Sequence, residues 1–254
     1  MLNIIGLQTL ISREIQRFSR VFIQSLISPW ISAFLYIVIF GVVIGGRIEM
    51  IGDYRYIDFV LPGLVMLNLI QASYQQGAFS LYMHRFQGSI QEILVAPFSY
   101  MEMLLAFLGA AILRGIIVGM GVYMLALLFT SATMAHFFLF VFYAIAVAFI
   151  FSCVGLLMGM WSNNFEQLNI LNTFVIMPLT FLGGIFNSIS MLPEKAQIFV
   201  RLNPFFYFVD GLRYAMIGVR ESNAVGGFVM IIILASGLAV LLWYLFSRGW
   251  RIKG

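Results

Sequence analysis

Long stretches without a charged side chain constrain the fold of this chain more than any other feature of its sequence. The segment Gly115–Phe165 contains no Asp, Glu, Lys or Arg. An apolar helix of about 20 residues crosses a bilayer core about 30 Å thick, so this segment is long enough for two crossings. Over the whole chain 62% of the residues are hydrophobic and 9% are charged, against about 25% charged in a soluble domain. The sequence therefore predicts an all-α integral membrane protein.

Charged and polar residues between the apolar stretches define six expected transmembrane helices. Arg20 and Arg47 bound the first, Asp58 and Arg85 bound the second, and residues 130–133 separate the third from the fourth. The expected spans cover residues 25–46, 59–83, 103–130, 136–161, 168–188 and 226–246. Because no soluble segment or internal repeat interrupts them, the expected organisation is a single transmembrane domain over residues 1–254.

Basic residues beside the first and last spans predict the orientation of the chain. Three arginines between residues 13 and 20 precede the first span, and Arg248, Arg251 and Lys253 follow the last. Lys and Arg next to spans favour the cytoplasmic side. The segment 189–222, expected outside, also carries basic residues, but short tails follow this rule most closely. Both termini are therefore expected in the cytoplasm, for a multi-pass protein of a bacterial inner membrane.

Two shorter segments have helical patterns but are unsuited to crossing the membrane. In residues 1–22, apolar side chains recur at spacings of three and four, with arginines largely on the other side. This pattern predicts an amphipathic helix on the inner membrane surface; a cytoplasmic extension of the first span is the alternative. Residues 203–219 are apolar but hold Asp210 and Arg213 in their middle. They are expected to form a short re-entrant or interfacial helix before the last span.

A third short helix is predicted in the cytoplasmic loop between the second and third spans. Gly88 precedes the segment Ser89–Val95 and Pro97 follows it, and proline cannot continue a helix. Such an amphipathic helix is suited to a groove in a soluble partner, and an ordinary surface helix is the alternative. The candidate contact residues are Gln87, Ser89, Ile90, Glu92, Leu94 and Pro97.

Polar residues inside the expected spans are candidates for a translocation pathway. Arg114 lies well inside the third span, where an arginine costs at least about 2.5 kcal/mol on insertion scales. It is expected to face a partner or a wet cavity, or alternatively to extend toward the inner headgroups. Polar side chains in membranes face protein, so those of the second span either line a pathway or pack against other helices. The candidates in this span are Asn68, Gln71, Tyr74 and Gln75.

Prolines, glycines and aromatic residues supply the remaining candidates. Glycines four residues apart, such as Gly155 and Gly159, permit close helix crossing, more simply within one chain than between two. The hinge candidates, for which a static kink is the alternative, are Pro62, Pro178, Gly183 and Gly184. The candidates for an outer gate, whose aromatic members are more simply an outer interfacial belt, are Phe205, Phe206, Tyr207, Asp210 and Arg213.

Several kinds of chemistry are not expected in this chain. Its lysines, Lys195 and Lys253, do not follow a glycine-rich loop, so there is no nucleotide-binding loop of the G-x-x-x-x-G-K-[ST] kind. His84 and His136 fall at opposite membrane faces, and no other metal-ligand cluster or nucleophile–base pair stands out. The basic residues are spread over tails and loops rather than gathered for nucleic acid. We therefore expect no catalytic residue, metal site or cofactor on this chain.

Four short motifs resemble the ABC-2 family of transport permeases, and the resemblance covers essentially the full chain. The motifs are Leu61-Pro62-Gly63-Leu64, Glu92-Ile93-Leu94-Val95-Ala96-Pro97, Arg114-Gly115, and Asn203-Pro204 followed by Gly211-Leu212-Arg213-Tyr214. Each motif alone is weak, but their order and spacing together are specific. The chain is thus similar to the transmembrane subunit of an ATP-binding-cassette exporter.

The resemblance implies partners and a role for the cytoplasmic loop. In this family two permease chains pair, here as an expected homodimer, and two separate ATPase subunits bind ATP and Mg²⁺. The loop Gln87–Pro97 matches the position of the family's coupling helix, so Glu92 is expected to contact the ATPase. The first 22 residues match its interfacial helix. An amphipathic, drug-like, lipid-linked or glycan substrate is expected.

Two other functions are compatible with the sequence. A stand-alone secondary transporter or channel needs coupling carboxylates inside its spans, whereas every Asp and Glu of this chain falls in an expected tail or loop. A membrane scaffold without transport has no need of the polar residues in the second and third spans.

Overall fold

The computed structural model describes residues 4–46, 50–51, 54–96, 98–130 and 134–251, which are mostly helical. Of the positions named above, residues 1–3, Arg47, Pro97, 131–133 and Lys253 lie outside the described residues. The α-helices are α1 (Ile4–Arg20), α2 (Ser28–Val38), α3 (Tyr56–Phe86), α4 (Ser89–Val95), α5 (Tyr100–Ala126), α6 (Phe137–Trp161), α7 (Phe165–Leu171), α8 (Met177–Phe181), α9 (Glu194–Leu202), α10 (Pro204–Ile217) and α11 (Ala224–Ser247).

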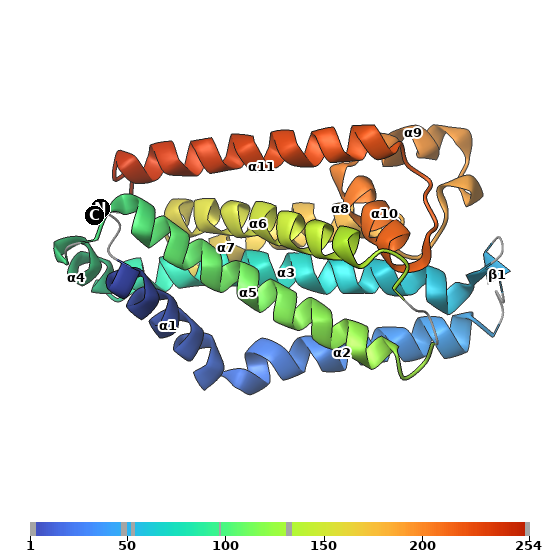
Figure 1. The fold of residues 1–254 in the computed structure, drawn as a ribbon, viewed down its shortest axis with the longest axis horizontal. Helices are drawn as coiled ribbons and strands as arrows, with labels where there is room; N and C mark the ends of the chain where they lie inside the picture. The colour runs from blue at the N-terminus through green and yellow to red at the C-terminus, as the bar shows by residue number, and fades with distance from the viewer. Residues whose placement is uncertain (1–3, 47–49, 52–53, 97, 131–133, 252–254) are drawn as a thin grey trace.

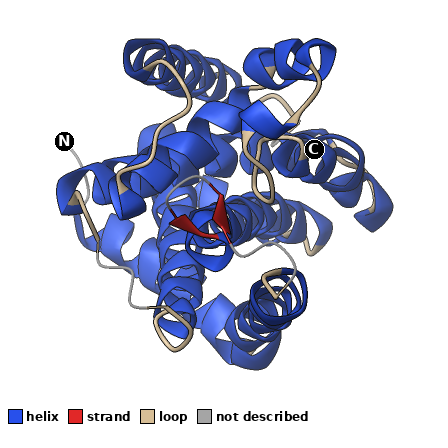
Figure 2. Ribbon diagram, turned by 90° about the vertical axis from the view of Figure 1, so that its right-hand side faces the viewer, coloured by secondary structure: helices blue, strands red, loops and turns tan. Residues whose placement is uncertain are grey.

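Shorter elements join or extend these helices. The π-helical turns are η1 (Ile23–Ile27), η2 (Ile39–Ile44) and η3 (Asn172–Ile176), and a 3₁₀ turn, η4, covers Ile189–Met191. Strands β1 (Met50–Ile51) and β2 (Tyr54–Arg55) form an antiparallel hairpin that pairs Met50 with Arg55. This hairpin lies at one end of the helix bundle, over its centre when the bundle is viewed from that end (Figure 2). We call this the hairpin end and the opposite one the α4 end (Figure 1).

Five helices within the described residues are long and apolar enough to cross a membrane. They cover Ile23–Gly41, Tyr56–Phe86, Tyr100–Ala126, Phe137–Trp161 and Ala224–Ser247, and each overlaps one of the expected spans. The prediction of a membrane protein built from apolar helices is therefore confirmed. The short helices predicted around Ser89–Val95 and in residues 203–219 also form, as α4 and α10.

The expected span over residues 168–188 has different bounds. The α7–η3–α8 segment is helical from Phe165 to Phe181, and Leu182 caps its end. The prediction that Gly183 and Gly184 lie inside this helix is wrong. Gly184 has a φ of +80°, a left-handed conformation that ends helices and that glycine adopts without a steric penalty.

Helix α3 is the core of the bundle. Of its most apolar stretch 83% is buried, against 22% for Ile23–Gly41 and 17% for α11. It packs most extensively against α6 and α5, while α2 and α11 lie along opposite edges of the bundle (Figure 1). This arrangement follows from composition, because α2 and α11 are strongly apolar and can face lipid, whereas the amide-bearing α3 cannot.

Glycines allow α5 and α6 to approach α3 closely. A Cβ on Gly155 of α6 would lie 2.3 Å from the carbonyl oxygen of Tyr74, and one on Gly159 would lie 2.7 Å from that of Ala78. On α5, a Cβ on Gly115 would meet the side-chain hydroxyl of Ser73. The prediction that these glycines serve packing within one chain is confirmed.

The interior contact at Gly155 can be tested by substitution. Gly155→Ala places a methyl group against α3 backbone, which cannot give way as a side-chain end can, so we expect a loss of about 1–3 kcal/mol in stability. Gly237→Ala on α11, where an added Cβ meets no atom within 4 Å, is the matched control. Thermal unfolding of the two detergent-purified variants should show a lower melting temperature for Gly155→Ala alone. Equal melting temperatures would contradict this packing.

Candidate functional site

A polar groove follows α3 through the middle of the bundle. It consists of two adjoining cavities: an arginine cavity of about 360 Å³, lined by Arg17 and Arg114 among others, and an amide cavity of about 290 Å³, lined by Asn68 and Gln71 among others. On α3 the groove extends from residue 67 to residue 79. This corresponds to roughly 18 Å along the helix axis, more than half of the bilayer core.

Three parts of the chain surround the groove. Besides α3, these are the stretch from Arg17 in α1 to Tyr36 in α2, the residue Arg114 on α5, and the segment Phe165–Met177. The hydroxyl of Tyr74 donates to the carbonyl oxygen of Leu168 at 2.7 Å, which ties α3 to α7 beside the cavity. The polar lining residues are Arg17, Gln24, Ser25, Ser28, Ser32, Tyr36, Asn68, Gln71, Tyr74, Gln75, Gln76, Arg114 and Asn169. Neither Asp nor Glu is among the described lining residues.

Arg114 points into the arginine cavity and makes hydrogen bonds to neutral groups there. Its Nη1 donates to Oε1 of Gln76 at 3.0 Å, and its Nη2 donates to the carbonyl oxygen of Ser25 at 3.4 Å. Pro29 explains why this carbonyl is accessible: proline has no N–H to donate to the carbonyl four residues earlier, and that carbonyl belongs to Ser25. Arg114 thus lines a cavity of the described structure, and its role there stays a prediction.

Helix α4 begins after Gly88, whose φ of +73° suits glycine. Its apolar face is buried at Ile90 and Ile93, where it shares a hydrophobic cluster with Leu10 of α1 and several residues of α5. The opposite face is exposed, and the side chain of Val95 is 88% exposed. This division agrees with the amphipathic pattern of the sequence and leaves one face free for a partner.

A buried hydrogen-bond chain joins α1, α3 and α4. The carboxylate of Glu14 on α1 accepts from Nη2 of Arg17 at 2.7 Å and from the hydroxyl of Ser80 on α3. Its other oxygen lies 2.8 Å from Nε2 of His84 near the end of α3, and Nδ1 of that ring lies 2.8 Å from the hydroxyl of Ser89 in α4. We call this chain the Glu14–His84–Ser89 link.

The protonation of Glu14 is set by this link. Burial by itself raises the pKa of Glu14, but the hydrogen bond from His84, the charge of Arg17 and the hydroxyl of Ser80 together hold the pKa below its usual value of 4.5. The carboxylate form therefore dominates at neutral pH. A charge in this place stabilises the link because it accepts several hydrogen bonds at once.

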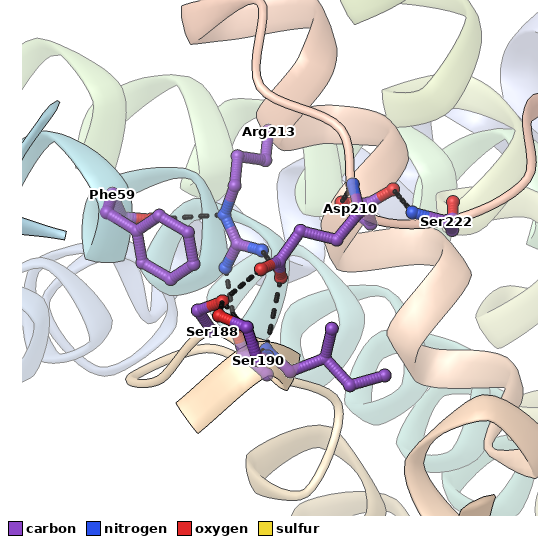
Figure 3. A network of polar contacts seen from close by, with 9 residues as sticks. Phe59, Ser188, Ser190, Asp210, Arg213 and Ser222 are labelled. Carbon is purple, nitrogen blue, oxygen red and sulfur yellow. Dashed lines mark hydrogen bonds and ion pairs between the residues drawn. The ribbon is translucent and has the colours of Figure 1, made fainter. Parts of the chain in front are cut away.

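A second buried polar network lies at the hairpin end (Figure 3). Arg213 of α10 is fully buried and stacks on the ring of Phe59 in α3, with its Cζ 3.8 Å from the ring centroid. It donates to the carbonyl oxygens of Phe59 and Gly184 and lies 3.7 Å from the carboxylate of Glu221. Asp210 instead accepts from the backbone N–H groups of Glu221 and Ser222 at 2.8 and 2.9 Å. The network fastens three separate segments to α10.

Residues 6–217 match the family model of the ABC-2 type transporter. The chain belongs to this family. It is also similar to the proteins named inner membrane transport permease YadH of Escherichia coli K12 and of Shigella flexneri, at 33% identity over 245 residues and 96% of each chain. The protein is thus a multi-pass membrane transport permease, and permeases of its family generally pair with an ATPase subunit.

The pathway candidates of this ABC-2 permease come together in the groove. Asn68 and Gln71 line the amide cavity, Tyr74 and Arg114 line the arginine cavity, and Gln75 lines both. Their role in transport stays a prediction. Of the loop candidates, Ser89, Ile90, Glu92 and Leu94 lie in α4 and Gln87 directly before it, while Pro97 lies outside the described residues.

The outer-gate candidates do not line either cavity in the described structure. Phe205 and Phe206 are buried, at 5% and 1% exposure, so the interpretation of these rings as an interfacial belt is wrong. They pack instead inside the permease, Phe205 against Phe151 and Phe206 beside Val200. The reason is that α10 packs against both α3 and α6.

The proline candidates occupy different settings. Pro62 lies buried within α3, which continues past it. Pro178 is the second residue of α8, which directly follows the π-helical turn η3, and Pro29 is likewise the second residue of α2 after η1. A π-turn is a common site of helix bending and of function. Both of these turns adjoin residues that line the amide cavity, and the hinge role of Pro178 stays a prediction.

Sequence reasoning missed three residues of this permease that prove central. In the sequence Glu14 stands among the basic residues Arg13, Arg17 and Arg20, His84 has no second metal ligand beside it, and Arg85 only bounds an expected span. Nη1 of Arg85 donates to the carbonyl oxygens of Gly159 and Met160 at 2.8 and 2.7 Å and thereby caps α6. A signal for Glu14 existed in the sequence: it lies on the same helical face as Leu10 and Phe18, at a spacing of four.

The Glu14–His84–Ser89 link predicts a pH-dependent stability difference. Glu14→Gln removes a buried carboxylate with several donors, so we expect a loss of about 1–3 kcal/mol at neutral pH. Because the pKa of Glu14 is lowered by folding, this stabilisation exists above the usual value of 4.5 and is lost as the pH falls through the lower value of the folded protein. The difference in melting temperature from wild type should therefore shrink as the pH falls below about 4.5.

The control for this prediction is Glu166→Gln, which changes an exposed carboxylate on α7. It should leave the melting temperature close to wild type over the same pH range. A Glu14→Gln variant as stable as wild type at pH 7 would show that the link contributes nothing to the fold.

Proposed function

We propose that this chain is the permease half of an ATP-driven exporter of the bacterial inner membrane, in which two copies pair and two separate ATPase subunits dock at the α4 end. ATP and Mg²⁺ bind on those subunits and not on this chain. The observation that carries the proposal is the groove along α3, whose arginine cavity is lined by Arg17, the close neighbour of Glu14 in the link to α4. The proposed path for cargo and the link to α4, where an ATPase subunit would dock, thus both involve α3.

The proposal includes six spans in a single domain: the five long apolar helices and, between α6 and α11, the segment Phe165–Phe181. Its start packs against Tyr82 and Phe86 near the α4 end of α3. Gly184, just beyond its end, is bound by Arg213, which also binds Phe59 near the hairpin end of α3. The segment thus extends between the two ends of the bundle, and its wider π-turn accommodates Pro178 on the way.

We place the α4 end in the cytoplasm. Helix α1 begins and α11 ends at this end of the bundle (Figure 1). Arg17 pairs with Glu14, which His84 and Ser89 link to α4, and Arg248 and Arg251 directly follow α11. These arginines are therefore on the same side as α4, and basic flanks favour the cytoplasm. In this orientation α1 is the interfacial helix, α4 is the coupling helix, and α10 is a re-entrant helix from the outer side.

The coupling mechanism follows from how α4 is attached. ATP-driven closure of the ATPase subunits would press on the exposed face of α4, which carries Gln91, Glu92 and Val95. Since the buried face of α4 packs with α1 and α5, and Ser89 bonds His84 of α3, displacement of α4 moves the helices that line the groove. The prolines after the π-turns η1 and η3 let the other lining segments bend.

The homodimer and the cargo class complete the proposal. The segment Ile23–Gly41 is only 22% buried in one chain, and its exposed apolar side chains include Ile31, Phe34 and Leu35. This surface beside the groove is suited to a second copy, which would close the path between the two chains. A groove of amides, hydroxyls and arginines between apolar helices suits an amphipathic, drug-like, lipid-linked or glycan substrate.

The first test is affinity purification of the tagged chain from native membranes in mild detergent after crosslinking. We expect a stoichiometric soluble protein with a G-x-x-x-x-G-K-[ST] loop to co-purify, identified by mass spectrometry. Recovery of the chain alone would contradict ATP coupling. A stand-alone secondary transporter or channel would then be the leading function.

A second test separates coupling from scaffolding. Val95→Glu and Glu92→Arg alter the exposed face of α4 without touching its buried side, so we expect normal membrane insertion. Transport should be lost, and the affinity of the chain for the ATPase subunit should fall at least tenfold. Val225→Glu, at a side chain 70% exposed at the start of α11, is the control at the other end of the bundle. Unchanged transport in both α4 variants would refute the coupling role.

A further inference from the structure

The arginine cavity holds a cation without a counter-ion in the described part of the chain. Arg114 lies roughly 20 Å along α5 from its first residue, Tyr100, near the middle of this span. Its hydrogen bonds go to the neutral oxygens of Gln76 and Ser25, and its Nε is buried without a partner. An arginine at such a depth is costly unless an opposite charge compensates it.

The second cation of this cavity is already compensated. Arg17 pairs with Glu14, whose side chain is 1% exposed and also bonds Ser80 and His84. Glu14 therefore does not line the cavity, and the described lining residues include neither Asp nor Glu. The arginine cavity consequently has a net positive charge that comes from Arg114, and it offers neutral donors from the amides of Gln24, Gln75 and Asn169.

The cavity also has an apolar margin. Val21, Phe79 and Phe165 line it and remain 50%, 47% and 44% exposed. Its volume of about 360 Å³ falls within the range of about 300–1,000 Å³ that is typical of small-molecule sites. An anionic group bound at Arg114 would therefore have room beside it for an attached apolar chain along these exposed side chains.

We propose that the arginine cavity binds the anionic oxyacid group, a phosphate or carboxylate, of an amphiphile, with Arg114 as its charged contact. The amide side chains donate to the remaining oxygens, and the apolar margin holds the hydrocarbon part. Binding itself is independent of ATP coupling; only the identification of this amphiphile as the transported cargo rests on the proposed function.

The test measures binding of dodecyl phosphate to the purified full-length chain in an uncharged detergent by native mass spectrometry. We expect Arg114→Gln to weaken this binding roughly tenfold or more, as expected for the loss of one charge-assisted hydrogen bond. Arg114→Lys should retain part of the affinity because it keeps the charge. Arg20→Gln, at an exposed arginine of α1 outside the cavity, should bind as wild type. Equal binding by Arg114→Gln and wild type would overturn the proposal.

A stability measurement excludes a merely structural role. If Arg114 served only to hold Gln76 and Ser25, Arg114→Gln would lower the melting temperature of the chain without ligand, and this result would count against the proposal. Because its charge is uncompensated, we expect the empty variant to melt at or above the wild-type temperature. Dodecyl phosphate should raise the melting temperature of wild type but not of the variant.

Two further probes identify the source of the anion. Inorganic phosphate alone should bind at least tenfold more weakly than dodecyl phosphate; equal binding would show a free-anion site and overturn the amphiphile assignment. Dodecylphosphocholine, whose phosphate charge is internally compensated, should also bind more weakly, and equal binding would refute the need for net charge. If the chain purifies without an ATPase subunit but still binds dodecyl phosphate through Arg114, the site is upheld and the proposed exporter is contradicted.

Discussion

Helix α3 carries amide and hydroxyl side chains that hydrocarbon cannot solvate, and the arrangement of the other helices follows from where those groups go. Its buried surface packs on the glycines of α5 and α6, such as Gly115 and Gly155. Its remaining polar side chains line the groove. Without the close approach that these glycines permit, α3 would not lie deep enough to keep its polar groups away from lipid.

The two ends of α3 are fastened by polar networks of different kinds. At the hairpin end, Arg213 binds the carbonyl oxygens of Phe59 and Gly184, so α10 and the turn after α8 are held to α3. At the α4 end, Glu14 and His84 connect α3 to two short helices that lie outside the spans. The first network immobilises backbone. The second joins separate helices through side chains, which suits a part of the molecule that transmits movement.

Proline links the backbone of the groove to its electrostatics. Pro29 cannot donate to the carbonyl of Ser25, and Arg114 on a different helix donates there instead. Arg114 is thereby held in the cavity by neutral groups alone, which leaves its charge available to a ligand. The free carbonyl of Ser25 in η1 thus helps to hold the guanidinium of Arg114, the one uncompensated cation among the described groove residues, in the cavity.

The sequence by itself determined the membrane class, five of the helices close to their observed bounds, the short helix α4 and five of the polar residues that line the groove. Hydrophobic periodicity and charge spacing are local properties, and lipid imposes the same length on every span. Only the tertiary structure decided that Glu14 and His84 meet across 70 positions of sequence, that Phe205 and Phe206 are buried, and that a helix expected to continue through Gly184 ends at Phe181. These features depend on which helix faces come together, because the partner of a buried polar group lies far away in the sequence and no periodicity encodes it.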